Sequence, residues 1–151
     1  MQSIHHDSAA LPDGLTVHET ATALAVQDLY ALRAATAAMY ADLAALDPFG
    51  AQTATASDAS ALVADACDAD AVLDVLSGCR VDFLRLGVSA VDWRAWGENA
   101  GPESWDGVAV RWGVLADDLR RLAASLESAG LSGAAEHVRR AAIHADDIAD
   151  S

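Results

Sequence analysis

The chain contains no lysine, only two cysteines, three prolines and 5% aromatic residues. Two cysteines are too few for a disulfide scaffold. A chain of 151 residues can bury about two-thirds of its unfolded surface, so it needs no covalent or metal staple to fold. Few aromatic residues and abundant alanine mean that the core must be built from small side chains, leucines and four tryptophans.

Long apolar runs are also missing from the sequence. None reaches the roughly 20 residues that a membrane-spanning helix needs, so we expect no membrane span. The first residues, MQSIHHDSAALPDG, have neither the basic nor the apolar region of a secretory signal peptide. We therefore expect a cytoplasmic protein, or one exported without a cleavable signal peptide.

Negative charge dominates the chain. Acidic residues number 23 and basic residues nine, which gives a net charge of −14 at pH 7. Such a surface repels nucleic-acid phosphates and anionic lipid, so we expect no nucleic-acid partner. The lack of lysine beside abundant alanine, aspartate and arginine is typical of a high-GC genome such as an actinobacterium, although salt adaptation produces a similar excess of acid.

Residues 1–15 are predicted to form a flexible N-terminal arm, and residues 16–151 a single helical-bundle domain. Thr16 and Glu19 have the spacing of a capping box, in which each side chain bonds the other's backbone N–H. They predict a helix over 17–46, which Pro48 and Gly50 end. Its apolar side is expected to contain Leu29, Leu32, Met39, Leu43 and Leu46.

The middle of the chain is less regular. Residues 51–58 are polar and are interpreted as a linker. A second helix is predicted over 59–77, with Ser57 or Asp58 as its N-cap. Its buried side is expected to contain Leu62, Ala66, Leu73 and Leu76. Apolar residues continue at helical spacing over 81–88, and residues 97–102 are interpreted as a turn.

The clearest pattern lies after this turn, where apolar residues alternate at spacings of three and four. They are Trp105, Val108, Trp112, Leu115, Leu119, Leu122 and Leu126. This heptad seam predicts a helix that opens at Pro102 or Glu103, ends at Gly130 and packs lengthwise against another helix.

A last helix is predicted over 133–149, capped by Ser132. Its seam contains Leu131, Ala135, Val138, Ala142 and Ala145. No segment has the alternation of a β-strand. The sequence therefore predicts an all-α, antiparallel helical bundle of about four main helices.

Acidic residues and histidines are the candidate metal ligands in this sequence. The acidic run contains Asp65, Asp68, Asp70 and Asp74. A calcium loop that starts at Asp68 would need Gly and Glu where Leu73 and Cys79 stand, so a solvated helix face is the better interpretation. His137 and His144 are roughly 10 Å apart along one helix, too far to bind one ion together. We expect no metal and no cofactor, and we expect Glu136 to pair with Arg140.

The four tryptophans flank the predicted turn. Trp93 and Trp96 precede it, and Trp105 and Trp112 follow it. They can pack together as an aromatic plug at one end of the bundle. Alternatively, some remain exposed as anchors for a partner helix, which makes these four residues the candidates for an interaction site.

A family resemblance rests on the same region. It consists of Ala95-Trp96-Gly97, a glycine-containing turn, the run 107–112 and the seam through Leu126. Together these features resemble the WXG-type small helical hairpin proteins of type VII secretion. The resemblance covers about residues 57–150. In that family a Trp and a Gly lie in the turn between two long helices, and the resemblance implies a role in pairing with another helical protein. No tyrosine follows Tyr40, so the family's C-terminal export signal is absent.

Two functions follow as expectations. The first is a non-catalytic interaction protein that pairs with a helical partner or with itself as a homodimer. The family resemblance implies a component or substrate of type VII secretion. The alternative is a small bundle enzyme or ligand-binding protein with its site between helices. Convergence of its candidate polar residues in one buried pocket would favour the alternative. These are His18, Asp28, Tyr40, His137 and His144.

Overall fold

The computed structural model describes residues 16–46, 50–79 and 105–150. Within these ranges the chain forms helices and no strands, as predicted. The helices are α1 (Val17–Leu46), α2 (Ala51–Cys67), α3 (Asp70–Cys79), α5 (Trp105–Ser128) and α6 (Ser132–Ala149). The N-terminal arm and the segment that contains Trp93 and Trp96 lie outside the described residues.

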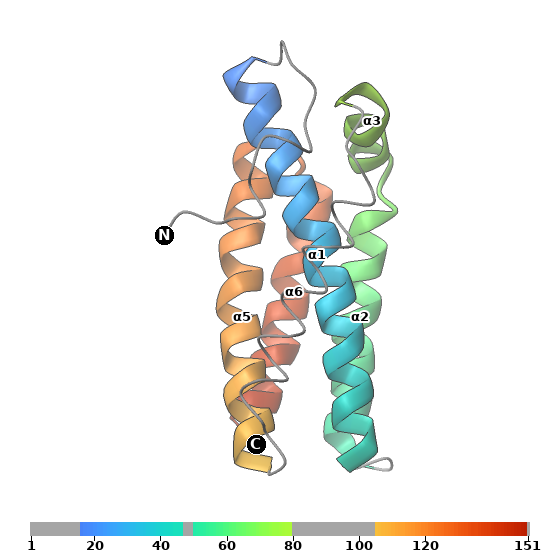
Figure 1. Ribbon diagram of the computed structural model, residues 1–151, viewed down its shortest axis with the longest axis vertical. Helices are drawn as coiled ribbons and strands as arrows, with labels where there is room; N and C mark the ends of the chain where they lie inside the picture. The colour runs from blue at the N-terminus through green and yellow to red at the C-terminus, as the bar shows by residue number, and fades with distance from the viewer. Residues whose placement is uncertain (1–15, 47–49, 80–104, 151) are drawn as a thin grey trace.

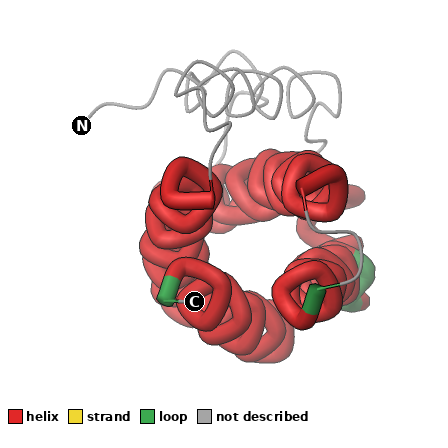
Figure 2. The backbone as a smooth tube through the Cα atoms, turned by 90° about the horizontal axis from the view of Figure 1, so that it is seen from below, coloured by secondary structure: helices red, strands yellow, loops and turns green. Residues whose placement is uncertain are grey.

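The four long helices form a ring (Figure 2). The closest pairs are α5 with α6, α2 with α6, α1 with α2, and α1 with α5. Neighbours in this ring run antiparallel, so α1 and α6 run in one direction and α2 and α5 in the other (Figure 1). The predicted antiparallel bundle is confirmed, and α2 and α5 lie diagonally across it.

The start of α1 forms as predicted. The Thr16 backbone N–H donates to a carboxylate oxygen of Glu19 at 2.9 Å, and the Glu19 N–H donates to the Thr16 hydroxyl at 3.1 Å. The first of these bonds lowers the pKa of Glu19. Further along, Leu29 and Leu43 are fully buried, whereas Leu46 is exposed at the end of the helix.

The predicted linker over 51–58 is wrong, because these residues form the first half of α2. The helix begins after Gly50, and neither Ser57 nor Asp58 caps it. Ala56 and Ala59 are fully buried. Thr55 donates its hydroxyl to the Ala51 carbonyl within the helix. Burial of these alanines in the bundle outweighs the weak helix propensity of serine and threonine.

The predicted helix over 59–77 is interrupted. Asp68 ends α2, and its backbone N–H donates to carbonyls of the last turn. The helix restarts at Asp70, so the residues that face the core change. Val72 is fully buried, whereas Leu73, predicted to be buried, is 45% exposed.

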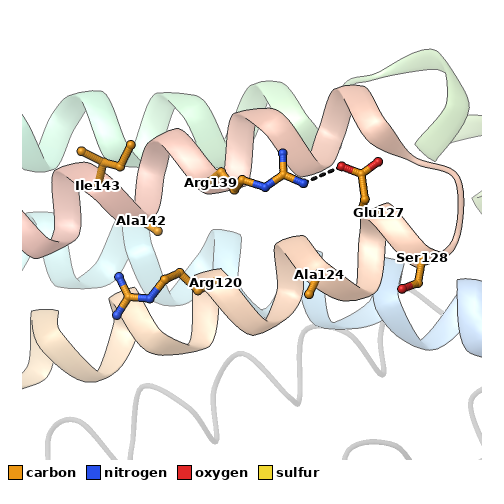
Figure 3. A pocket seen from close by; sticks show the side chains of 7 residues that line it. All are labelled: Arg120, Ala124, Glu127, Ser128, Arg139, Ala142 and Ile143. Carbon is orange, nitrogen blue, oxygen red and sulfur yellow. Dashed lines mark hydrogen bonds and ion pairs between the residues drawn. The ribbon is translucent and has the colours of Figure 1, made fainter.

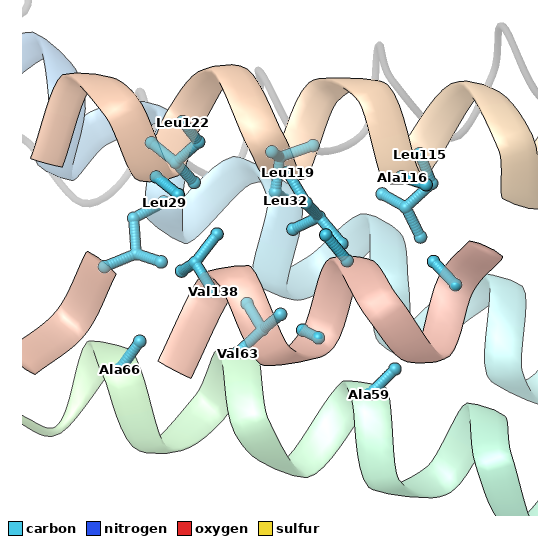
Figure 4. Packing of buried hydrophobic residues seen from close by; sticks show 14 of the residues in the cluster. Leu29, Leu32, Ala59, Val63, Ala66, Leu115, Ala116, Leu119, Leu122 and Val138 are labelled. Atoms are coloured by element: carbon cyan, nitrogen blue, oxygen red, sulfur yellow. The ribbon is translucent and has the colours of Figure 1, made fainter. Parts of the chain in front are cut away.

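The core is made mostly of the predicted seams (Figure 4). In α5 every seam residue from Val108 to Leu126 is buried, and Trp112 is 1% exposed. The side chain of Trp105 lies outside the described part. In α6 the predicted seam is buried throughout, and further apolar residues widen it. These additions are Ala134, Ala141 and Ile148.

A tight turn joins α5 to α6. Gly130 has φ of +83°, a backbone conformation that favours glycine. The Leu131 N–H donates to the Leu126 carbonyl, and the Gly130 N–H donates to the Glu127 carbonyl. These two bonds form a Schellman motif. Ser132 does not cap α6 as predicted, because Leu131 holds the N-cap position.

Candidate functional site: a groove between α5 and α6

A groove of about 670 Å³ runs between α5 and α6 on the outside of the bundle (Figure 3). From α5 it is lined by Arg120, Ala124, Glu127 and Ser128, and from α6 by Arg139, Ala142 and Ile143. From Arg120 to Ser128 the α5 lining spans eight steps of the helix, which corresponds to roughly 12 Å. The groove is therefore about two helical turns long.

The middle of the groove is apolar. Ala142 is almost fully buried and forms its floor, and Ala124 is exposed along the α5 side. Ile143 is 60% exposed. It lies outside the predicted α6 seam, so the packing of the bundle does not account for a large apolar side chain at this position. A large side chain exposed beside small ones leaves room for an apolar group from another molecule.

Arg120 sits at one end of the groove. Its guanidinium bonds the carboxylate of Asp117 on its own helix and that of Asp146 on α6. All three side chains are partly exposed. The pair with Asp146 ties the two helices together across the mouth of the groove. We call this set, Asp117, Arg120 and Asp146, the first ion cluster.

Arg139 sits at the other end (Figure 3). It bonds Glu127 across the helices and Glu136 on its own helix, the latter at 3.1 Å. Glu136 thus pairs with Arg139 and not with Arg140 as predicted. Glu127 also accepts a 2.6 Å hydrogen bond from the Ser132 hydroxyl. This bond, with help from Arg139, holds the pKa of Glu127 below its usual range. Glu127, Glu136 and Arg139 form the second ion cluster.

The two clusters have the same charge pattern. Each contains one arginine shared between two carboxylates. Each cluster therefore keeps one surplus negative charge. Exposed ion pairs of this kind contribute little to stability, so their main effect is on the potential that an incoming partner meets.

A second, much smaller cavity lies between α1 and α5. It measures about 10 Å³ and is lined by Met39, Asp42, Leu43, Val108, Arg111 and Trp112. This volume holds at most one water molecule. Arg111 is buried here and lies 3.7 Å from the Asp42 carboxylate. The cavity is thus a packing feature at a buried charge, and not a ligand site.

Among the predicted interaction residues, Trp112 is part of the hydrophobic core. It packs inside the bundle and lines the small cavity between α1 and α5. It is therefore not an exposed anchor, which corrects its place among the interaction candidates. Trp93 and Trp96 lie outside the described residues, as does the side chain of Trp105.

The five residues named for the enzyme alternative do not line either cavity. His18 is exposed in the first turn of α1, and the other four are half-buried. His137 places Nδ1 2.8 Å from the Gly133 carbonyl of its own helix. Cys67 is buried, and burial raises the pKa of its thiol to about 12. At neutral pH this thiol is protonated and therefore a poor nucleophile.

The four aspartates of the acidic run are exposed where α2 ends and α3 begins, as expected for a solvated face. In the part of the chain that the structure describes, no three potential ligands gather into a metal site. No described helix is both long and apolar enough to cross a membrane.

Comparison with known proteins finds no matching family model, no matching curated protein and no matching solved structure. The groove is therefore the feature from which a function can be inferred. The sequence patterns did not predict this groove, although one residue that lines it stands out in the sequence. Ile143 is an isolated β-branched apolar residue on the otherwise polar side of α6.

Proposed function

We propose that this chain is a non-catalytic interaction protein, and that a helix of another helical protein packs into the groove between α5 and α6. The observation that carries the proposal is the exposed side chain of Ile143 in an open, apolar groove. Helices bind such grooves with a few apolar side chains on one face. A groove two turns long accepts two such side chains, at spacing i and i+3 or i+4.

The resemblance to WXG-type proteins makes a component or substrate of type VII secretion the first named version of this role. The support is the amphipathic helix α5, whose seam contains the buried Trp112 and belongs to the part of the chain that carries the resemblance. The turn around Trp96 lies outside the described residues.

The experiment is co-purification with the helical proteins encoded by neighbouring genes, followed by sedimentation. We expect a complex that Ala124→Trp weakens at least tenfold, because the indole fills the groove. The matched control is Ala61→Trp, at an exposed alanine on α2, which should leave the complex intact. Equal binding by both variants would place the partner elsewhere on the molecule and contradict the proposal.

A homodimer is an outcome of the same experiment. Two chains that each carry −14 repel each other, and salt screens this repulsion. A self-dimer through the groove would therefore tighten as the salt concentration rises from about 0.01 to 0.15 M. A compact monomer at every salt concentration, with no heterologous complex, would contradict pairing altogether.

Ligand binding is the second candidate function, and the size of the groove favours it. About 670 Å³ lies within the range of roughly 300–1,000 Å³ that small-molecule pockets occupy. An apolar fluorescent dye tests this possibility. Saturable binding that Ala124→Trp abolishes and Ala61→Trp preserves, in a chain that binds no helical protein, would favour a ligand site.

A further inference from the structure

We propose that the helix bound in this groove is basic, with an apolar face of small residues or leucine flanked by arginine or lysine. This inference rests on the proposed function, since it names the chemistry of the partner at the same surface. It is carried by the charges at the two ends of the groove and by the charges at the end of α6.

The first observation is that the groove offers no unshared cation. Arg120 already bonds two carboxylates in the first ion cluster. Arg139 does the same in the second. An acidic partner would have to displace one of these bonds, whereas a basic partner adds a cation to a cluster with surplus negative charge. Carboxylates have several acceptor positions, so each can bond both its present arginine and a partner's cation.

The second observation is the charge at the C-terminal end of α6. Asp146, Asp147 and Asp150 stand there, and the last turn contains no basic residue. The helix dipole favours cations at this end, so these aspartates oppose it. A cation from a partner would offset that repulsion. Because Asp146 belongs to the first ion cluster, the unfavourable charges are continuous with one end of the groove.

A second copy of this chain fits the same surface less well. In a two-fold dimer the same patch meets itself, so each ion cluster would face other clusters with a surplus negative charge. Like charges opposed across an interface cost binding energy and slow association. The occupant with complementary charge is therefore a different, basic helix.

Three synthetic peptides of 16 residues test the inference against the full chain. All share one alanine–leucine face, and their flanking positions carry lysine, glutamine or glutamate. Fluorescence anisotropy at 0.15 M salt measures their dissociation constants. We expect the lysine peptide to bind at least tenfold more tightly than the glutamine peptide, and the glutamate peptide to bind most weakly.

Two double variants separate local from overall charge. Asp117→Asn with Asp146→Asn removes two charges at the groove, and Asp58→Asn with Asp65→Asn removes two exposed charges on α2. Net charge changes equally in both. The groove variant should bind the lysine peptide about tenfold more weakly, and the α2 variant within twofold of the parent chain. Equal loss in both would mean that only the overall charge attracts the peptide, which would overturn the inference.

Failure of this inference can be told apart from failure of the proposed function. If lysine and glutamine peptides bind equally and Ala124→Trp abolishes both, the groove binds helices but does not select basic ones. If Ala124→Trp leaves the binding of every peptide unchanged, or if no peptide binds, both the basic partner and the groove as a docking site for helices are wrong. Circular dichroism confirms that each variant retains its helices.

Discussion

The core faces of α5 and α2 are equally well buried but are built from different residues. Along α5 the face contains Trp112, Leu115 and Leu119, all at most 1% exposed. Along α2 it contains Ala56, Ala59 and Ala66, with no exposed area, and two larger residues, Val63 and Cys67. The buried fraction is therefore the same, while the apolar area removed from water per residue is much larger on α5.

This difference separates two roles of a buried residue. The large side chains on α5 supply more hydrophobic stabilisation than the small ones on α2, since that term scales with buried area. Small side chains on α2 allow its backbone to lie close to α6, its main neighbour. We therefore expect α5 to be sensitive to truncation and α2 to enlargement.

The largest effect is expected from Trp112→Ala. Loss of a fully buried tryptophan should lower the free energy of unfolding by about 3–5 kcal/mol. Chemical denaturation measures it. Val110→Ala is the matched control, because Val110 is 67% exposed on the same helix and should change stability by about 0.5 kcal/mol or less. A loss below about 1 kcal/mol at Trp112 would contradict its place in the core.

Enlargement of α2 should be the next largest effect. Ala59→Leu inserts three carbons where Ala59 has no exposed area, so we expect a loss of about 1–3 kcal/mol from overpacking. Ala61→Leu, at an exposed position of the same helix, should be nearly neutral. Thermal unfolding of both variants measures these changes in stability. If Ala59→Leu raised stability, the interface between α2 and its neighbours would contain unfilled space.

Helix α1 differs from both α5 and α2, because it buries a polar residue in the core. Gln27 is 1% exposed, and neither atom of its side-chain amide has a hydrogen-bond partner in the described structure. A buried amide without partners costs free energy, which an apolar side chain of similar shape avoids. Gln27→Met should therefore raise stability by about 1 kcal/mol. Destabilisation in urea titrations would show that the amide bonds a group in the native protein.

The smallest effect is expected on the outer face of α5, opposite its seam. Arg120→Gln removes the exposed bonds to Asp117 and Asp146 and should cost no more than about 1 kcal/mol, and less at high salt. Denaturation at low and high salt measures it. A loss as large as that of Trp112→Ala would mean that the ion clusters, and not the seam, hold α5 to α6.

Much of the fold could be predicted from the sequence where local and tertiary signals agree. The capping box fixes the start of α1, and the heptad spacing identifies the buried face of α5. Predictions failed where tertiary packing overrode local composition. Residues 51–58 are polar, yet Ala56 is buried in the bundle, and the break after Cys67 turned Leu73 outward.

The groove could not be predicted, because it depends on which helices are neighbours. Heptad spacing predicts a packed face but does not name the partner helix. Arg120 and Asp146 are 26 residues apart, so only the pairing of α5 with α6 brings them together. Ile143 alone gave a local signal, as an apolar residue outside its seam.

The turn at Gly130 has a consequence for folding. It joins α5 and α6 through three residues, so the contacts of this hairpin are local in sequence and close quickly. Contacts between α1 and α5 span some sixty residues or more and must wait for a much longer loop to close. During synthesis α1 and α2 leave the ribosome before α5 and α6, at about 5–20 residues per second. For several seconds α1 and α2 therefore exist without the α5–α6 hairpin that covers them, and in that interval their apolar faces are exposed to aggregation.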